Sequence, residues 1–193
     1  MNKGLADKWN QIYQSQTIRS EPVAVLVENL FLLPKTGRAL DLAGGLGENA
    51  LLLAKQGLTT EGWYISAVAM RKLQQQADAQ ALPVKTFTKE ITPYSFASAC
   101  FDVIVVSRFL DRSICNAIME SLKPNGLLFY QTYTQQKVSE LGPQNPHFLL
   151  VENELLQLFS SLKAVYYREN AGLGEIQHGL RNEAQFIGQK IEA

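Results

Sequence analysis

The segment Asp41–Ala50 (DLAGGLGENA) joins a carboxylate to a glycine-rich turn, and these residue types predict a small-molecule binding loop. Glycines let the backbone approach a ligand closely and adopt positive φ angles. The residues from Glu48 onward predict a helix, whose first free N–H groups would point at that ligand. Asp41 ends an otherwise apolar strand pattern, where a carboxylate is costly unless it meets a polar partner.

Two ligand classes fit this loop. Gly45–Ala50 matches the G-x-G-x-x-A pattern of dinucleotide-binding turns, which is a weak signal when it stands alone. Asp41 would repel a pyrophosphate, whereas it suits a cationic amino group. Dehydrogenases of the dinucleotide type also tend to add a substrate domain, for which a chain of 193 residues leaves no room. A ligand with an amino group is favoured, and a nicotinamide-dependent oxidoreductase remains the alternative.

Strand and helix patterns alternate along the chain. Strands are predicted at 38–43, 59–65, 84–90, 100–110, 127–134, 164–170 and 183–190, and helices at 6–14, 22–33, 48–57, 66–80, 111–123 and 152–161. This alternation predicts right-handed βαβ units and a mostly parallel sheet. The last two strands have no helix between them, so they must form an antiparallel hairpin. We expect one α/β domain over residues 1–193, with residues 1–35 as an N-terminal helical cap.

The composition excludes several function classes. Lys plus Arg and Asp plus Glu both number 18, which gives zero formal charge and a pI near 6.7. Nucleic-acid binders usually carry a basic excess, so we expect a small-molecule substrate and no nucleic-acid partner. No apolar run reaches the roughly 18 residues of a membrane span, and the N-terminus lacks the apolar stretch of a secretory signal. Two cysteines fit no disulfide framework. These features predict a cytoplasmic protein, monomeric or homodimeric, with no membrane partner.

Three segments resemble the signatures of one superfamily. Residues 39–54 (ALDLAGGLGENALLLA) resemble the first motif of class I S-adenosylmethionine-dependent methyltransferases, in which an acid precedes a glycine loop. Residues 101–110 and 122–134 resemble the fourth-strand and fifth-strand signatures of the same superfamily. Within it, the chain looks closest to the small bacterial tellurite-resistance-type methyltransferases. The resemblance implies a Rossmann-like three-layer sandwich with a seven-stranded sheet, S-adenosyl-L-methionine as cofactor, and methyl transfer to a small-molecule acceptor.

The resemblance also implies which residues contact the cofactor. The methionine part and the loop beneath it correspond to Asp41, Ala43, Gly45 and Gly47. Glu90 falls where an acid usually meets the adenine amino group, with Ile91 beside the ring, and Ser107 falls near the sulfonium. No catalytic residue is implied, because a methyl transfer to a soft or deprotonated acceptor needs no base. The two histidines, His147 and His178, do not argue for a metal site.

Tyr64 departs from the superfamily pattern. The superfamily normally has Asp or Glu at the end of the second strand, bonded to both ribose hydroxyls, and Tyr64 stands in this place. Glu61 is three residues earlier, so strand alternation predicts that it points to the opposite face. Tyr64 offers one hydroxyl at most for the ribose. A non-catalytic protein that kept the methyltransferase fold is therefore a further alternative.

Overall fold

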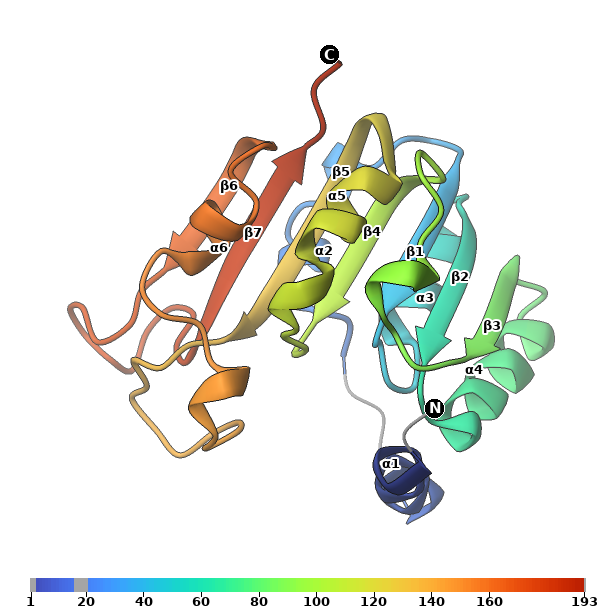
Figure 1. Ribbon diagram of the computed structural model, residues 1–193, viewed down its shortest axis with the longest axis horizontal. Helices are drawn as coiled ribbons and strands as arrows, with labels where there is room; N and C mark the ends of the chain where they lie inside the picture. Colours follow the sequence, from blue (N-terminus) through green and yellow to red (C-terminus); the bar gives the residue numbers. More distant parts are fainter. Residues whose placement is uncertain (1–2, 16–20, 193) are drawn as a thin grey trace.

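The computed structural model describes residues 3–15 and 21–192, which form one mixed sheet with helices on both faces (Figure 1). The strands are β1 (Arg38–Leu42), β2 (Thr59–Tyr64), β3 (Val84–Thr88), β4 (Phe101–Ser107), β5 (Leu122–Tyr133), β6 (Lys163–Glu169) and β7 (Glu183–Gln189). The helices are α1 (Lys3–Ser15), α2 (Ala24–Val27), α3 (Glu48–Lys55), α4 (Ala67–Ala79), α5 (Cys115–Ser121) and α6 (Glu154–Leu158).

The strand order is β3-β2-β1-β4-β5-β7-β6. Strand β1 pairs in parallel with both β2 and β4, so the order reverses there. Strand β7 lies between β5 and β6 and runs antiparallel to both. The predicted fold class, a mostly parallel seven-stranded sheet that ends in an antiparallel hairpin, is confirmed.

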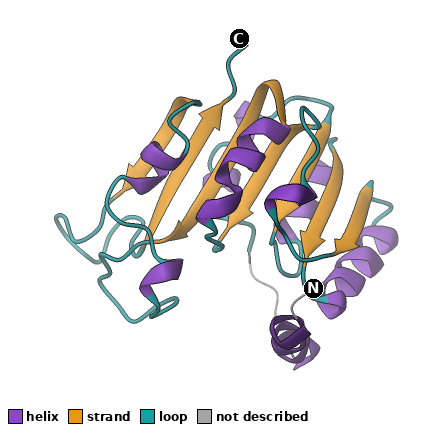
Figure 2. Cartoon of the chain, viewed as in Figure 1, coloured by secondary structure: helices purple, strands orange, loops and turns teal. Residues whose placement is uncertain are grey.

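The fold has three layers, because helices cover both faces of the sheet. Helices α2, α3 and α4 cover one face of the sheet, and α5 and α6 cover the other (Figure 2). Residues 103–106 of β4 are fully buried, as expected of a central strand with helices on both sides. Helix α1 lies beyond the carboxyl ends of the parallel strands and packs against α4 (Figure 1). None of the described helices is long and apolar enough to span a membrane.

Some predicted helices are shorter than their sequence pattern. The helix predicted over 22–33 is wrong in extent: α2 ends at Val27, and residues 30–32 form a separate 3₁₀ turn. The side-chain amide of Asn29 donates to the carbonyl of Val25 at 3.0 Å, and such local bonds compete with helix continuation. The helices predicted over 111–123 and 152–161 also begin later and end earlier, as α5 and α6.

Candidate active site

A cavity of about 1020 Å³ opens at the carboxyl ends of the parallel strands. It is lined by residues of α1 and of the segments 43–46, 64–65, 89–91, 107–112 and 143–148, together with Tyr133. Drug-sized ligands occupy sites of about 300–1,000 Å³, so the volume of this cavity is at the top of that range. It lies at the point where the strand order reverses, which is where ligands bind in open α/β sheets.

The glycine loop forms the floor of this cavity. Ala43 and Gly45 both adopt left-handed backbone conformations, with φ angles of 57° and 59°. The amide N–H of Ala43 donates to the carbonyl oxygen of Trp63 at 2.9 Å, which anchors the turn on β2. A Cβ atom on Gly44 would lie 2.1 Å from Oδ2 of Asp41, so the turn closes directly over this carboxylate. The loop thus presents backbone, with almost no side chain, to a ligand.

Asp41 lies under the loop and does not line the cavity. It is 1% exposed, and its two oxygens accept hydrogen bonds from the amide N–H of Ala50 at 3.1 Å and from Nδ2 of Asn49 at 3.3 Å. Burial raises the pKa of the Asp41 carboxyl to about 6, although these two bonds oppose the shift. The carboxylate therefore ties the strand to the first turn of α3.

Asn49 connects three parts of the site, and the sequence reasoning missed it. Its Nδ2 also donates to Oγ of Ser107 at 3.1 Å, and its Oδ1 accepts from the amide N–H of Val23 at 2.9 Å. Ser107, at the end of β4, is thereby fixed beside Asp41. The available signal was a polar residue on the otherwise apolar, core-facing side of the predicted helix.

Gly47 serves the packing of two helices. It has a φ angle of 80° and is not among the cavity residues. A Cβ atom there would lie 2.4 Å from Cδ2 of Leu73 on α4. The structure therefore brings Ala43 and Gly45 to the cavity and leaves Gly47 facing the interface between α3 and α4.

An aromatic cluster surrounds Tyr64, which is 7% exposed. The ring centroids of Tyr13 and Trp9 on α1 lie 5.7 and 5.9 Å from that of Tyr64. The hydroxyl groups of Tyr13 and Tyr64 interact with each other, and burial raises the pKa of both phenols. An aspartate in place of Tyr64 would be covered by two rings. The tyrosine is thus a packing residue for α1 as well as part of the cavity wall.

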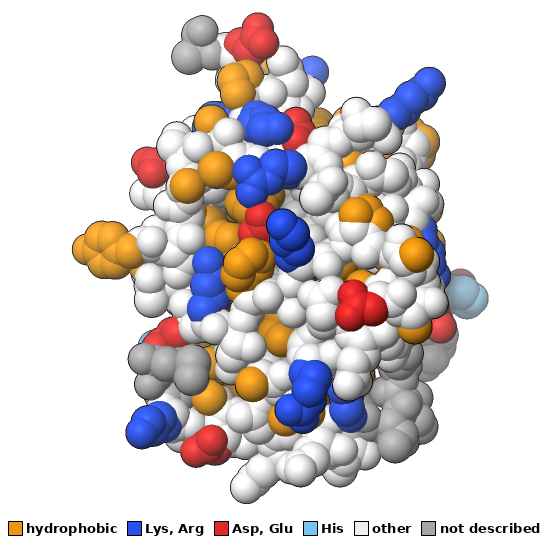
Figure 3. Space-filling model, turned by 90° about the vertical axis from the view of Figure 1, so that its right-hand side faces the viewer, with side chains coloured by type: hydrophobic (Ala, Val, Ile, Leu, Met, Phe, Trp, Pro, Cys, Tyr) orange, Lys and Arg blue, Asp and Glu red, His pale blue; other side chains and the backbone are white. Residues whose placement is uncertain are grey.

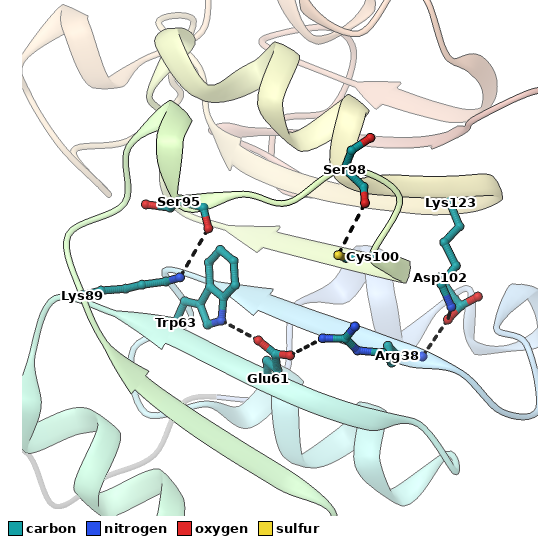
Figure 4. Close-up of polar contacts among 9 residues, drawn as sticks. All are labelled: Arg38, Glu61, Trp63, Lys89, Ser95, Ser98, Cys100, Asp102 and Lys123. Atoms are coloured by element: carbon teal, nitrogen blue, oxygen red, sulfur yellow. Dashed lines mark hydrogen bonds and ion pairs between the residues drawn. The ribbon is translucent and has the colours of Figure 1, made fainter.

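Glu61 lies on the other face of β2, as the strand alternation predicts (Figure 4). Its carboxylate accepts from Nη2 of Arg38 at 2.7 Å and from Nε1 of Trp63 at 2.9 Å. Lys89 reaches over the Trp63 ring, with Nζ 3.2 Å from the ring centroid, and also lines the cavity. On the side of the molecule that carries β3, apolar and basic side chains are interspersed (Figure 3).

The segment after β3 brings Glu90 and Ile91 to the cavity. Both are partly buried, and Ile91 packs against the core on the α5 side of the sheet. Ser107 reaches the same cavity from the neighbouring strand β4. The structure thus places Glu90, Ile91 and Ser107 around one cavity with the glycine loop.

Two arginines that follow β4, Arg108 and Arg112, also line the cavity. Arg112 uses four of its five N–H donors: its guanidinium donates to both oxygens of Glu154, at 2.5 and 2.9 Å, and to the carbonyl oxygens of His147 and Leu149. Among the residues that the structure describes, Arg108 forms a single side-chain bond, from Nε to Oε1 of Glu183 at 2.9 Å. The sequence shows the two arginines, but their acidic partners lie 42 and 75 positions away.

The sheet order, the glycine turn after β1 and the cavity beside it define a class of α/β proteins with a ligand site at the first strand–helix turn. A family model described as "Methyltransferase domain" matches residues 13–174, so the chain belongs to this methyltransferase family. The "Putative methyltransferase YqeM" of Bacillus subtilis (strain 168) is 27% identical over 124 residues, which cover 58% of this chain and 49% of that protein. The chain thus spans about half the length of this relative.

Solved structures show the same fold. TehB from Haemophilus influenzae superposes with a TM-score of 0.68 at 21% identity, over 96% of this chain and 66% of that chain. The geranyl diphosphate C-methyltransferase from Streptomyces coelicolor A3(2), solved with Mg²⁺, geranyl diphosphate and S-adenosyl-L-homocysteine, gives 0.70 at 13% identity, over 96% and 98%. At these identities the likeness concerns the fold, and the predicted resemblance to tellurite-resistance-type methyltransferases is confirmed at that level.

Proposed function

We propose that this protein transfers a methyl group from S-adenosyl-L-methionine to a small-molecule acceptor. The observation that carries the proposal is the backbone loop of residues 43–46, which floors a cavity wide enough for cofactor and acceptor together. The family match to a methyltransferase domain supports it, as does the S-adenosyl-L-homocysteine bound by the Streptomyces structure of the same fold.

The residues on this side of the cavity fit such a cofactor. Ala43 and Gly45 would lie under its methionine part, where both residues line the cavity in left-handed backbone conformations. Ser107, held by Asn49, would lie near the sulfonium. Glu90 and Ile91 would flank the adenine, the first by accepting from its amino group and the second through apolar contact.

Asp41 and Gly47 would act through the loop. Asp41 fixes the turn from below and adds negative charge near the place of a cationic amino group. Gly47 allows α3 to approach α4 and so orients the first turn of α3 toward the cavity.

When bound, S-adenosyl-L-methionine supplies an electrophilic methyl group on a sulfonium. The protein then contributes binding, orientation of the acceptor for in-line attack, and exclusion of water. Helix α1, with Trp9 and Tyr13 over Tyr64, closes the ribose side of the cavity against solvent. We assign no base, and an acceptor that is already nucleophilic at neutral pH needs none.

Tyr64 favours a second candidate function, a methyltransferase-fold protein that no longer binds the cofactor. A phenol covered by two rings cannot replace a carboxylate that accepts from two ribose hydroxyls. Because the loop, Glu90 and Ser107 still converge on one cavity, we favour cofactor binding and methyl transfer.

Parallel calorimetric titrations with S-adenosylmethionine, S-adenosylhomocysteine and NAD test the proposal. We expect both sulfur compounds to bind and NAD not to bind. A ligand at a hundred times its Kd stabilises a fold by about 2.7 kcal/mol, so thermal unfolding gives a second readout. Binding of NAD alone would favour an oxidoreductase, and binding of none of the three would favour the non-catalytic alternative.

A further inference from the structure

Arg108 has an unusual backbone conformation for a charged residue of the cavity. It follows β4 directly and has a φ angle of 52°, a left-handed conformation that is uncommon outside glycine. The amide N–H of Arg108 donates to the carbonyl oxygen of Gln131 at 2.8 Å, which holds the backbone in this turn. Such strained positions persist where the surrounding structure fixes them, and they concentrate at functional sites.

A buried polar network fixes the Arg108 side chain. Glu183 is 5% exposed, and its two oxygens accept from Nε of Arg108 and from Nε2 of Gln131. Oε1 of Gln131 in turn accepts from Nε2 of Gln185 at 3.0 Å and from the amide N–H of Val25 at 2.9 Å. Strands β5 and β7 and helix α2 therefore all contribute to the orientation of one guanidinium.

The terminal nitrogens of Arg108 are left available. Within the part of the chain that the structure describes, its Nη1 and Nη2 donate to no protein atom, and its side chain is 49% exposed. Glu183 is not among the cavity residues, whereas Arg108 is. The Glu183 carboxylate is thus buried in the sheet, whereas the two Nη groups of Arg108 are accessible from the cavity. Together, these two groups can donate two parallel hydrogen bonds to an oxyanion.

The surroundings of Arg108 say what the rest of the ligand is like. Phe109, Leu110, Tyr133 and Phe148 line the same cavity as Arg108, so a largely apolar body would fit in it together with an anionic end. Arg112 is less suited to this role, because Glu154 and two carbonyl groups already accept from four of its five N–H donors, including both of those on Nη2.

We propose that Arg108 is the specificity-determining residue for an oxyanion, a carboxylate or a phosphate, on an apolar methyl acceptor. This inference rests on the proposed methyl transfer, because it assigns the acceptor side of the same cavity. The guanidinium holds the anionic end, and the acceptor's apolar body then lies toward Ser107 and the glycine loop.

Binding of small probes tests the proposal. The protein saturated with S-adenosylhomocysteine is titrated with benzoate, with phenyl phosphate and with the neutral benzamide. We expect one of the two anions to bind at least about tenfold more tightly than benzamide, since a charge-assisted hydrogen bond contributes about 1.5–3 kcal/mol. Arg108→Gln should remove this preference, and Arg108→Lys, which lacks the fork, should keep only part of it. Benzoate and phenyl phosphate distinguish the two kinds of oxyanion.

Arg71→Gln is the matched control, because Arg71 is an exposed arginine on α4 outside the cavity. It should leave the anion preference unchanged. A wild-type protein that binds neither anion better than benzamide overturns the proposal, as does an Arg108→Gln variant, folded by circular dichroism, that keeps the preference. If Arg108→Gln does not fold, an unchanged preference in Arg108→Lys overturns it instead.

The titrations also separate the two proposals. If the wild type does not bind S-adenosylhomocysteine, the proposed methyl transfer fails, and the same probes are added to the free protein to judge Arg108. If S-adenosylhomocysteine binds but the anion preference is absent, only the assignment of Arg108 fails.

Discussion

The two halves of the cavity are built in different ways. The half formed by β1 and the loop after it is local: Asp41 and Ala50, which close the turn, are 9 positions apart. The half formed by β4, β5 and β7 depends on distant pairs, since Arg108 and Glu183 are 75 positions apart. A local turn can be recognised in a single sequence, whereas partners from distant strands are known only once the sheet order is known.

The halves also differ in what they offer a ligand. The first half presents backbone over a buried carboxylate, and the rings of Trp9 and Tyr13 cover it at Tyr64. The second half presents a guanidinium whose counter-ion is hidden in the sheet. We expect the first half to bind the cofactor and the second half to distinguish among methyl acceptors.

Gly47→Val should have the largest effect, on the stability of the first half. The left-handed backbone strains any β-branched residue, and its side chain would overlap Leu73, so we expect a loss of about 3–5 kcal/mol in the free energy of unfolding. Urea denaturation measures it. Gly172→Val is the control, because a Cβ atom there meets no atom of the described residues within 4 Å. Equal losses in the two variants would contradict a packing role for Gly47.

Asp41→Asn should change how stability depends on pH. The folded pKa is about 6 and the ordinary value is 3.8, so the folded state holds a proton that the unfolded state releases. The stability that this carboxyl contributes is complete below pH 3.8 and is lost as the pH rises through about 6. Asparagine does not titrate, so the variant lacks this loss. We therefore expect the free energy of unfolding of Asp41→Asn, relative to that of the wild type, to rise by about 3 kcal/mol between pH 3.8 and about 6.

Denaturation of both proteins at a series of pH values measures this difference, in which the other titrating groups cancel. A constant offset of about 1–3 kcal/mol is also expected, because the asparagine amide would face one of the donors that Asp41 now accepts from. Parallel stability curves for the two proteins would show that the buried carboxyl is not perturbed.

Arg112→Gln should cost more stability than Arg108→Gln, although the two arginines border the same half of the cavity. Each variant leaves a buried carboxylate, Glu154 or Glu183, without its guanidinium, but the first removes four side-chain hydrogen bonds among the described residues and the second removes one. We expect losses of about 3 and about 2 kcal/mol, measured by urea denaturation. Similar losses would remove the distinction between a structural arginine and one that is available to a ligand.

The sequence predicts the parts of this molecule that follow from local pattern. The strand–helix alternation and the missing helix between 164–170 and 183–190 predict the sheet and its antiparallel end, because these are consequences of connection length. The glycine loop is predicted for the same reason. The helix over 22–33 is predicted too long, since Asn29 bonds back to Val25 and no periodicity reveals such a bond.

The site is predicted less completely than the fold. The roles of Asp41 and Gly47 in the loop need the third dimension: one carboxylate lies beneath the turn, and one missing Cβ faces another helix. Asn49, which holds Asp41, donates to Ser107, 58 positions further along the chain, and the covering of Tyr64 depends on where α1 packs. The contacts of Gly47, Asn49 and Tyr64 join segments that lie far apart in the sequence, whereas Asp41 bonds within its own turn.

Tyr64→Phe should have the smallest effect, and it sharpens the comparison on the first half. The variant keeps the ring that packs under Trp9 and Tyr13 but removes the hydroxyl group that interacts with Tyr13. We expect a loss of about 0.5–1 kcal/mol in stability. Because the hydroxyl is already directed at Tyr13, the affinity for S-adenosylhomocysteine should stay within about twofold, as calorimetry would show, whereas loss of a ribose bond would weaken it about tenfold. Tyr13→Phe removes the same interaction from the other side and should give an equal loss of stability. A tenfold weaker Tyr64→Phe beside an unchanged Tyr13→Phe would instead assign the Tyr64 hydroxyl to the ribose.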